Sequence, residues 1–226
     1  MSDVWDASMK DCLVSVSDHV FFNVVTSALE AYKLAHVTDG GSCSHVETFG
    51  HLWGYATKDA LGLATVYRLV WSDTSTAVKR SKDSVTFDDE AYQLKERFID
   101  SFFPEVSYMG DFHSHPYSLE DDKIKTELEL ERKKLYQFSK PDFDSVRQLQ
   151  NDGADYRVGL VATVYSRDKK VNRSTAWLDD QSCLRFQYDE LTIWLKAYVW
   201  SGDAIDGFRR KTDKMVRLIC PAVGAV

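Results

Sequence analysis

The apolar and polar positions of the N-terminal part of the chain predict three strands and one helix. Residues 13–17 alternate between apolar and polar side chains, which is typical of a short strand. Residues 19–36 repeat apolar side chains at intervals of three and four, which predicts a buried helix. Residues 46–55 and 61–71 are strand-like runs, and the second is rich in β-branched and aromatic side chains. The chain is therefore expected to begin with both kinds of element.

The middle of the chain continues this mixture. Residues 91–103 keep apolar side chains at the helical period until Pro104, which predicts a surface helix. The sequence VSYMGDFHSHP, residues 106–116, predicts a short strand that Pro116 stops. Residues 118–137 are highly charged and carry a few apolar side chains at near-helical spacing, so we expect them to be mainly helical.

The last third of the chain is predicted to hold one helix and several strands. The helix should begin near Ser139 and end at a turn at residues 151–153. Four apolar runs predict strands, of which the last also fits a helix: residues 156–166, 174–178, 183–188 and 191–200. Strands and helices mixed without strict alternation predict an α/β fold of mixed α+β type, with a central mixed β-sheet flanked by helices. We expect one domain, residues 1–226, whose C-terminal extension at about 201–226 shows no clear pattern.

Composition and charge narrow the functional classes. Hydrophobic residues make up 44% of the 226 residues, enough for a sizeable core, and the formal net charge is −7. Such a chain has no general attraction to nucleic acid or to an anionic membrane, and no run approaches the ~20 apolar residues of a membrane span. The four cysteines form no CxxC pair, so we expect reduced thiols. These features predict a soluble, cytoplasmic protein, and they do not indicate its oligomeric state.

A pair of histidines is the first candidate for chemistry. His113 and His115 are two residues apart on a predicted strand, so both side chains should lie on one face and can bind one metal ion, while Ser114 points the other way. Asp111 shares that face but lies about 13 Å from His115 along a strand, which suits a supporting or structural role. By itself the tetrapeptide HSHP equally fits a polar strand end without a metal.

Two further features accompany the histidine pair. Glu47 precedes a glycine-spaced strand in HVETFGHLWGY, and SKPD places Ser139 and Asp142 at a helix start. Together the three features resemble the JAMM family of metalloproteases, also called MPN or JAB. Its pattern is a glutamate in an early strand, then His-Ser/Thr-His-Pro, then Ser-x-x-Asp. The resemblance covers about residues 13–165.

The resemblance implies a deubiquitinase-like isopeptidase. One Zn²⁺ per chain would be bound by His113, His115 and Asp142, Glu47 would activate water as general acid/base, and Ser139 would hold the oxygen of the reacting carbonyl. The bond cut would be an amide or isopeptide bond at the C-terminus of ubiquitin or a ubiquitin-like protein, which would also be the protein's partner. The residue chemistry alone supports only metal-assisted amide hydrolysis, so processing of a small sulfur-carrier protein or of a free peptide stays open.

The spacing departs from the family pattern. Seven residues usually separate the second histidine from the serine, whereas 23 residues, 116–138, separate His115 from Ser139 here. Ser118-Leu119-Glu120-Asp121 also has the Ser-x-x-Asp form and makes Asp121 an alternative third ligand. We favour Asp142, because a serine N-cap, a proline in the first turn and the helix dipole all suit that position.

The extra residues predict an insertion at about 117–138. It is expected to form a helix at about 120–131 with an extended return through Phe138, or a helical hairpin, because one continuous helix would end far from the metal. The insertion would stand beside the cleft and select the substrate or cover the zinc, or it would be a solvated surface segment.

A second function class stays open. A catalytically inactive MPN scaffold that binds protein partners would also explain the lengthened spacing. A nucleobase deaminase is disfavoured, because the paired-cysteine signature of that chemistry is missing. His45 and His51 flank Glu47, and we expect both to be structural or surface histidines.

Overall fold

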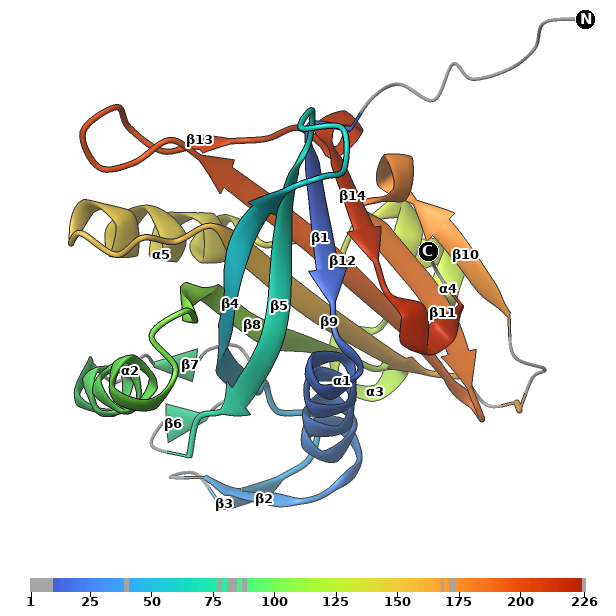
Figure 1. The fold of residues 1–226 in the computed structure, drawn as a ribbon. Helices are drawn as coiled ribbons and strands as arrows, with labels where there is room; N and C mark the ends of the chain where they lie inside the picture. The colour runs from blue at the N-terminus through green and yellow to red at the C-terminus, as the bar shows by residue number, and fades with distance from the viewer. Residues whose placement is uncertain are drawn as a thin grey trace, which may run out of the picture.

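Ten strands join in one mixed sheet in the computed structural model, which describes residues 10–38, 41–76, 79–80, 85–86, 89–167, 169–170 and 174–224 (Figure 1). Their order is β10-β11-β12-β9-β8-β4-β5-β1-β14, with β13 paired to β12. The central pair β8–β9 is parallel, as are β1–β5 and β1–β14, and the other pairs in this sheet are antiparallel. The strands are β1 Cys12–Val16, β4 Phe49–Lys58, β5 Thr65–Thr74, β8 Ser107–Tyr117, β9 Val158–Ser166, β10 Thr175–Leu178, β11 Cys183–Tyr188, β12 Leu191–Ser201, β13 Arg209–Arg210 and β14 Val216–Ile219.

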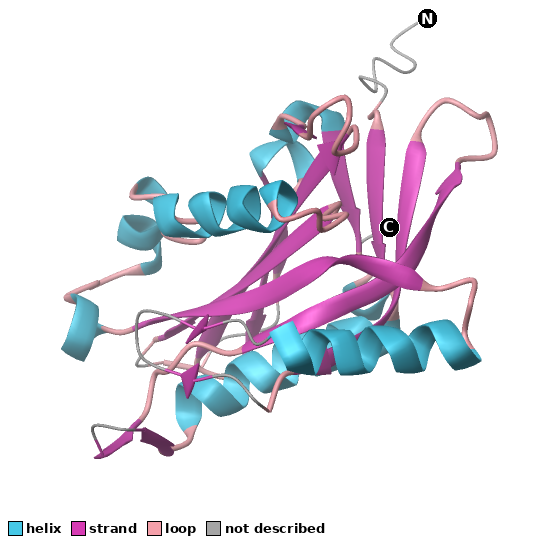
Figure 2. Cartoon of the chain, turned by 90° about the vertical axis from the view of Figure 1, so that its left-hand side faces the viewer, coloured by secondary structure: helices cyan, strands magenta, loops and turns pink. Residues whose placement is uncertain are grey.

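Helices lie on both sides of this sheet (Figure 2). The α-helices in the described residues are α1 Asp18–Lys33, α2 Asp89–Phe102, α3 Leu119–Asp122, α4 Glu127–Arg132 and α5 Lys140–Asn151. Three short 3₁₀ turns follow later in the chain, η1 Asp179–Gln181, η2 Asp213–Met215 and η3 Pro221–Val223. Two small hairpins complete the described elements, β2 His36–Thr38 with β3 Gly41–Cys43, and β6 Lys79–Arg80 with β7 Val85–Thr86. None of the helices in these residues is long and apolar enough to cross a membrane.

Helix α1 covers one sheet face and contributes to the main apolar core. The Ser17 side chain caps its N-terminus by accepting a hydrogen bond from the backbone N–H of Val20. Its buried side chains pack with alternate residues of the central strands, among them Leu52 of β4, Phe112 of β8 and Leu160 of β9. Because strand side chains alternate between faces, the neighbours of these core residues must point to the opposite face.

That opposite face is rich in aromatic side chains. Its cluster joins Trp53, Tyr108, Phe138, Tyr156, Tyr198 and Trp200 with residues of α2 and α5. A smaller cluster beside it contains Ile124 and Leu130 of the insertion together with Trp194 of β12. The candidate functional residues lie on this second face.

The mixed α/β class predicted from the sequence is confirmed, with local corrections. The strand predicted at residues 191–200 is confirmed as β12, so the helix alternative for this run is excluded. Strand β8 continues through Pro116 to Tyr117, so the prediction that Pro116 stops it is wrong. The backbone N–H of Ser114 donates to the Thr48 carbonyl, in the segment just before β4. Two residues later, the backbone nitrogen of Pro116 faces the same side of β8, but the pairing of β8 with β4 has already ended there. The missing N–H of Pro116 therefore costs no ladder hydrogen bond.

The insertion at 117–138 is less helical than predicted. The helix expected at about 120–131 is interrupted at Lys123, which adopts a left-handed conformation with φ 59°, so the segment forms the short helices α3 and α4. A non-helical stretch then returns through Phe138. Ile124, Leu130 and Tyr136 are buried, so the insertion packs on the sheet rather than standing in solvent.

A partly buried polar cluster attaches α2 to the sheet. The Asp73 carboxylate on β5 accepts hydrogen bonds from the Trp53 indole at 2.8 Å, from the His51 ring at 3.1 Å and from Lys95 of α2. His51 is therefore structural, as expected. Burial would raise the pKa of Asp73, but the hydrogen bonds and positive charge around it outweigh burial and lower its pKa to about 2.

Asp73 should contribute to acid sensitivity. Its folded-state pKa of about 2 lies below the ordinary 3.8, so its stabilising contribution is present above pH 3.8 and is lost as the pH falls toward 2. We expect Asp73→Asn to reduce the free energy of unfolding at pH 7 by about 1–2 kcal/mol and to flatten its change between pH 4 and 2. Urea unfolding at several pH values measures both effects, with Asp155→Asn as an exposed control. An unchanged pH profile in Asp73→Asn would contradict this role.

Candidate metal centre

Strand β8 presents the two histidines from one face. His113 and His115 are both buried, and their Nε2 atoms lie 3.2 Å apart. Ser114, between them, turns the other way and accepts a hydrogen bond from the backbone N–H of Thr48 at 3.0 Å. The period of two along a strand thus produces the arrangement that the sequence predicted.

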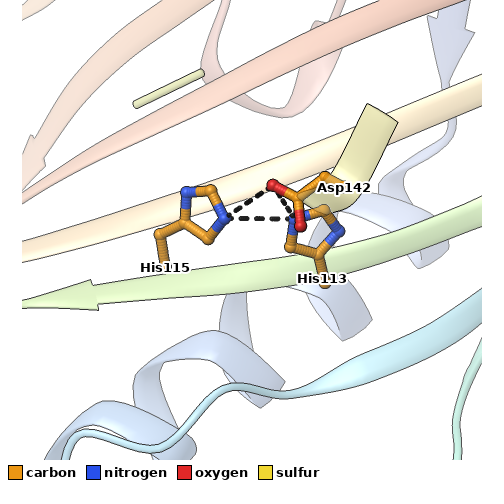
Figure 3. Close-up of side chains that lie close together, drawn as sticks. All are labelled: His113, His115 and Asp142. Atoms are coloured by element: carbon orange, nitrogen blue, oxygen red, sulfur yellow. Dashed lines mark hydrogen bonds and ion pairs between the residues drawn. The ribbon is translucent and has the colours of Figure 1, made fainter. Parts of the chain in front are cut away.

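Helix α5 supplies the third side chain. The Ser139 hydroxyl accepts a hydrogen bond from the backbone N–H of Asp142, and the Asp142 carboxylate accepts one from the backbone N–H of Ser139 at 2.6 Å. This reciprocal cap holds Asp142 in the first helical turn. Its Oδ2 atom lies 3.4 Å from His113 Nε2 and 3.3 Å from His115 Nε2 (Figure 3).

These three atoms fit the corners of a metal-binding tetrahedron. Two ligands that bind a metal ion at 2.0–2.1 Å with a tetrahedral angle are separated by about 3.3 Å. The three distances between His113 Nε2, His115 Nε2 and Asp142 Oδ2 are 3.2, 3.3 and 3.4 Å. His113, His115 and Asp142 can therefore hold one metal ion, with a fourth position left for another ligand.

The insertion supplies contacts behind these ligands. The Nδ1–H group of His115 donates a hydrogen bond to the Leu135 carbonyl at 3.3 Å, which leaves Nε2 as the ring atom that can bind a metal. The Phe138 ring packs on the His113 ring with centroids 4.9 Å apart. The insertion is thus a wall of the site.

The electrostatics of the site keep the Asp142 carboxylate negatively charged. Burial lowers the pKa of His113. Burial would also lower the pKa of His115, but its hydrogen bond and attraction to Asp142, with the charge of Glu47, raise it overall. Burial would raise the pKa of Asp142, yet the two imidazoles hold that pKa well below its ordinary value. Asp142 is consequently ionised at neutral pH and suited to a cation.

Glu47 lies beside the histidines without belonging to the ligand cluster. The residues on either side of it are fixed by backbone contacts: Val46 donates to the Ala31 carbonyl, and the Thr48 carbonyl accepts from the N–H of Ser114. Since Phe49 pairs with His113 in antiparallel register, Glu47 falls near His115 on the same face. Its side chain is half-buried, and its charge acts on His115.

The alternative third ligand does not join the cluster. Asp121 lies in α3 and forms an ion pair with His45 at 3.0 Å. It also contacts Ser118, whose hydroxyl caps α3. Among the described residues, the group that converges on one point contains Asp142 rather than Asp121.

Some features of the site carry no local sequence signal. The Leu135 carbonyl is a backbone group, and its role depends on how the insertion folds.

Asp111 was expected in a supporting or structural role, and it is buried and accepts a hydrogen bond from the Tyr156 hydroxyl at 2.7 Å. Burial raises the pKa of Asp111 to about 7, the Tyr156 bond opposes that rise, and the charge of Asp142 adds to it.

The ligand assignment predicts metal content. We expect about one equivalent of divalent metal in the purified protein, and loss of that metal in His115→Ala and Asp142→Ala, since each removes one of three ligands. Asp121→Ala should keep its metal and serves as the control. Inductively coupled plasma mass spectrometry measures the content, and circular dichroism verifies folding. Metal loss in Asp121→Ala with retention in Asp142→Ala would reverse the assignment.

Comparison of the chain with protein-family models and with curated proteins found no match. The arrangement of His113, His115, Asp142 and Glu47 is therefore the starting point for a functional proposal.

Proposed function

We propose that this protein is a JAMM-type zinc hydrolase that cuts an amide or isopeptide bond at the C-terminus of ubiquitin or a ubiquitin-like protein. The observation that carries the proposal is the convergence of His113, His115 and Asp142, with Glu47 beside them. The motifs that resemble the JAMM family suggest the substrate class, and the ligand geometry supports a metal-dependent reaction.

Zinc suits the donor set. Two neutral imidazole nitrogens and one carboxylate oxygen are ligands that zinc accepts in a tetrahedral site, and three protein ligands leave one position for water. A bound zinc ion supplies a Lewis acid and lowers the pKa of its water to about 7. A scaffold that only binds partners would not require this convergence, so the ligand geometry favours the enzyme over the inactive MPN alternative.

The chain's own residues can perform the proton transfers. Glu47 would accept a proton from the attacking water and deliver it to the departing amine, which leaves poorly unless it is protonated. The Ser139 oxygen accepts the Asp142 N–H, and this leaves the hydroxyl hydrogen available to donate to the negative oxygen of the tetrahedral species. Ser139 is exposed, so a substrate carbonyl can reach it.

A surface cavity borders α5, the helix that carries Asp142, and its lining residues do not include His113, His115 or Asp142. The cavity measures about 900 Å³ and runs along α5 toward the segment between β12 and β13. Lys140 and Phe143, which flank Asp142 closely in sequence, are among its lining residues. Trp200 and Phe208 add aromatic surface, and Arg210 adds positive charge. A cavity of this size suits contact with a substrate segment.

The proposal predicts chelator-sensitive cleavage. A panel of ubiquitin and ubiquitin-like fusions should be cut, and a zinc chelator should abolish cleavage until zinc is restored. Glu47→Gln should lower kcat by at least about 100-fold, because general acid–base catalysis is lost, while metal content is unchanged. Glu105→Gln, at an exposed turn, is the control. Full activity in Glu47→Gln would contradict its role, and no cleavage across the panel would remove the substrate class.

A further inference from the structure

A buried lysine lies behind the insertion on the sheet face that carries the metal centre. Lys196 of β12 has 0% exposure, and a charge so deeply buried needs close partners. Its ammonium group donates to Asp179 at 2.9 Å, to Ser182 at 2.8 Å and to Asp213 at 2.7 Å. Two carboxylates thus share one ammonium group, and in the described part of the chain Asp179 is the one that hydrogen-bonds to the insertion.

Asp179 connects this lysine to the insertion. Its Oδ1 atom accepts a hydrogen bond from the Tyr136 hydroxyl at 3.1 Å, and its Oδ2 atom accepts one from the Gln137 amide at 2.8 Å. Tyr136 and Gln137 directly follow Leu135, whose carbonyl accepts the Nδ1–H of His115. Asp179 therefore holds the two residues next to the backbone group that orients a metal ligand.

Tyr198, on the same face of β12 as Lys196, also holds the insertion. Tyr198, two residues beyond Lys196 on β12, accepts a hydrogen bond from the backbone N–H of Phe138 at 2.9 Å. Its ring packs on the Phe138 ring with centroids 4.4 Å apart. The return of the insertion is thus held at three consecutive residues before Ser139: Tyr136 and Gln137 bind Asp179, and Phe138 binds Tyr198 of β12.

The backbone that carries Asp179 is strained. Asp179, Asp180 and Gln181 have φ angles of 48°, 53° and 76°, a left-handed run that residues with side chains rarely adopt. Strain of this kind persists where surrounding contacts hold it, and it is frequent at functional sites. Here the carboxylate at the start of the strained turn is held by Lys196 and faces the insertion.

We infer that Asp179 is a positioning residue for the metal centre: held by Lys196, it fixes Tyr136 and Gln137 so that the Leu135 carbonyl orients His115. The inference rests on the proposed metal-dependent function. It adds that Asp179, far from the metal ligands in sequence, affects the orientation of His115. Asp179 touches neither the metal ligands nor Glu47 through any hydrogen bond among the described residues. It acts through the insertion, which makes the insertion a fixed support of the site.

The test compares two carboxylates on the same ammonium group. Asp179→Ala removes the link to the insertion, whereas Asp213→Ala removes the other carboxylate and leaves that link in place. We expect the zinc dissociation constant of Asp179→Ala to rise by about 10-fold to 100-fold, as is typical when a group that orients a metal ligand is removed. Competition with a chromogenic chelator measures the constant, and the visible absorption of the Co²⁺-loaded protein reports the coordination geometry. Asp213→Ala should change neither.

A milder variant keeps the test valid if Asp179→Ala does not fold. The double variant Tyr136→Phe/Gln137→Ala keeps the Lys196–Asp179 pair and breaks only its connection to the insertion. It should weaken zinc binding as Asp179→Ala does, while the melting temperature of the metal-free protein stays close to that of Asp213→Ala. Unchanged zinc affinity in both Asp179→Ala and the double variant would overturn the inference. Equal weakening of zinc binding in Asp213→Ala would overturn it as well. Absence of zinc binding by the unmodified protein would instead overturn the proposed function.

Discussion

Asp142 reaches the imidazoles of β8 because the chain returns to the same sheet face after the 23 residues that follow His115. Closing a loop of this length costs little more entropy than closing a shorter one. Holding a carboxylate oxygen 3.3–3.4 Å from two ring nitrogens is more demanding, because the loop must also be fixed in position. Burial of Ile124, Leu130 and Tyr136 and the contacts of Tyr136 and Gln137 with Asp179 meet this demand.

Side chains of strand β12 alternate between the two sheet faces, so the strand can hold the insertion on one face and keep the apolar core dry on the other. Leu195, Ala197 and Val199 point into the apolar core under α1. Lys196 and Tyr198 point to the other face and bind the insertion through Asp179 and Phe138. A buried ammonium group is stabilising only when its partners are complete, and here three oxygens surround it. One central strand thus serves the core with one face and the metal centre with the other.

The sequence predicted the parts of the site that depend on local rules. The period of a strand places His113 and His115 on one face, and Ser139 with Pro141 marks the start of α5. The path of the insertion depends instead on long-range contacts: the carboxylate that holds it lies at Asp179, 42 residues beyond Gln137. Its helix was predicted too long because a left-handed residue at Lys123 has no strong sequence signal. The end of strand β8 was predicted wrongly at Pro116, because a proline disrupts a strand only where its missing N–H would have bonded to a neighbouring strand.

The central claim is that one zinc ion is bound by two histidines and one aspartate, with a fourth position left for water. X-ray absorption spectroscopy at the zinc edge tests it most directly on the zinc-loaded protein. We expect four nitrogen or oxygen neighbours at about 2.0–2.1 Å, with the multiple scattering of two imidazole rings. The same spectrum of Asp142→Ala should lose this coordination. A sulfur neighbour at about 2.3 Å, or scattering from fewer than two imidazoles, would contradict zinc binding by His113, His115 and Asp142.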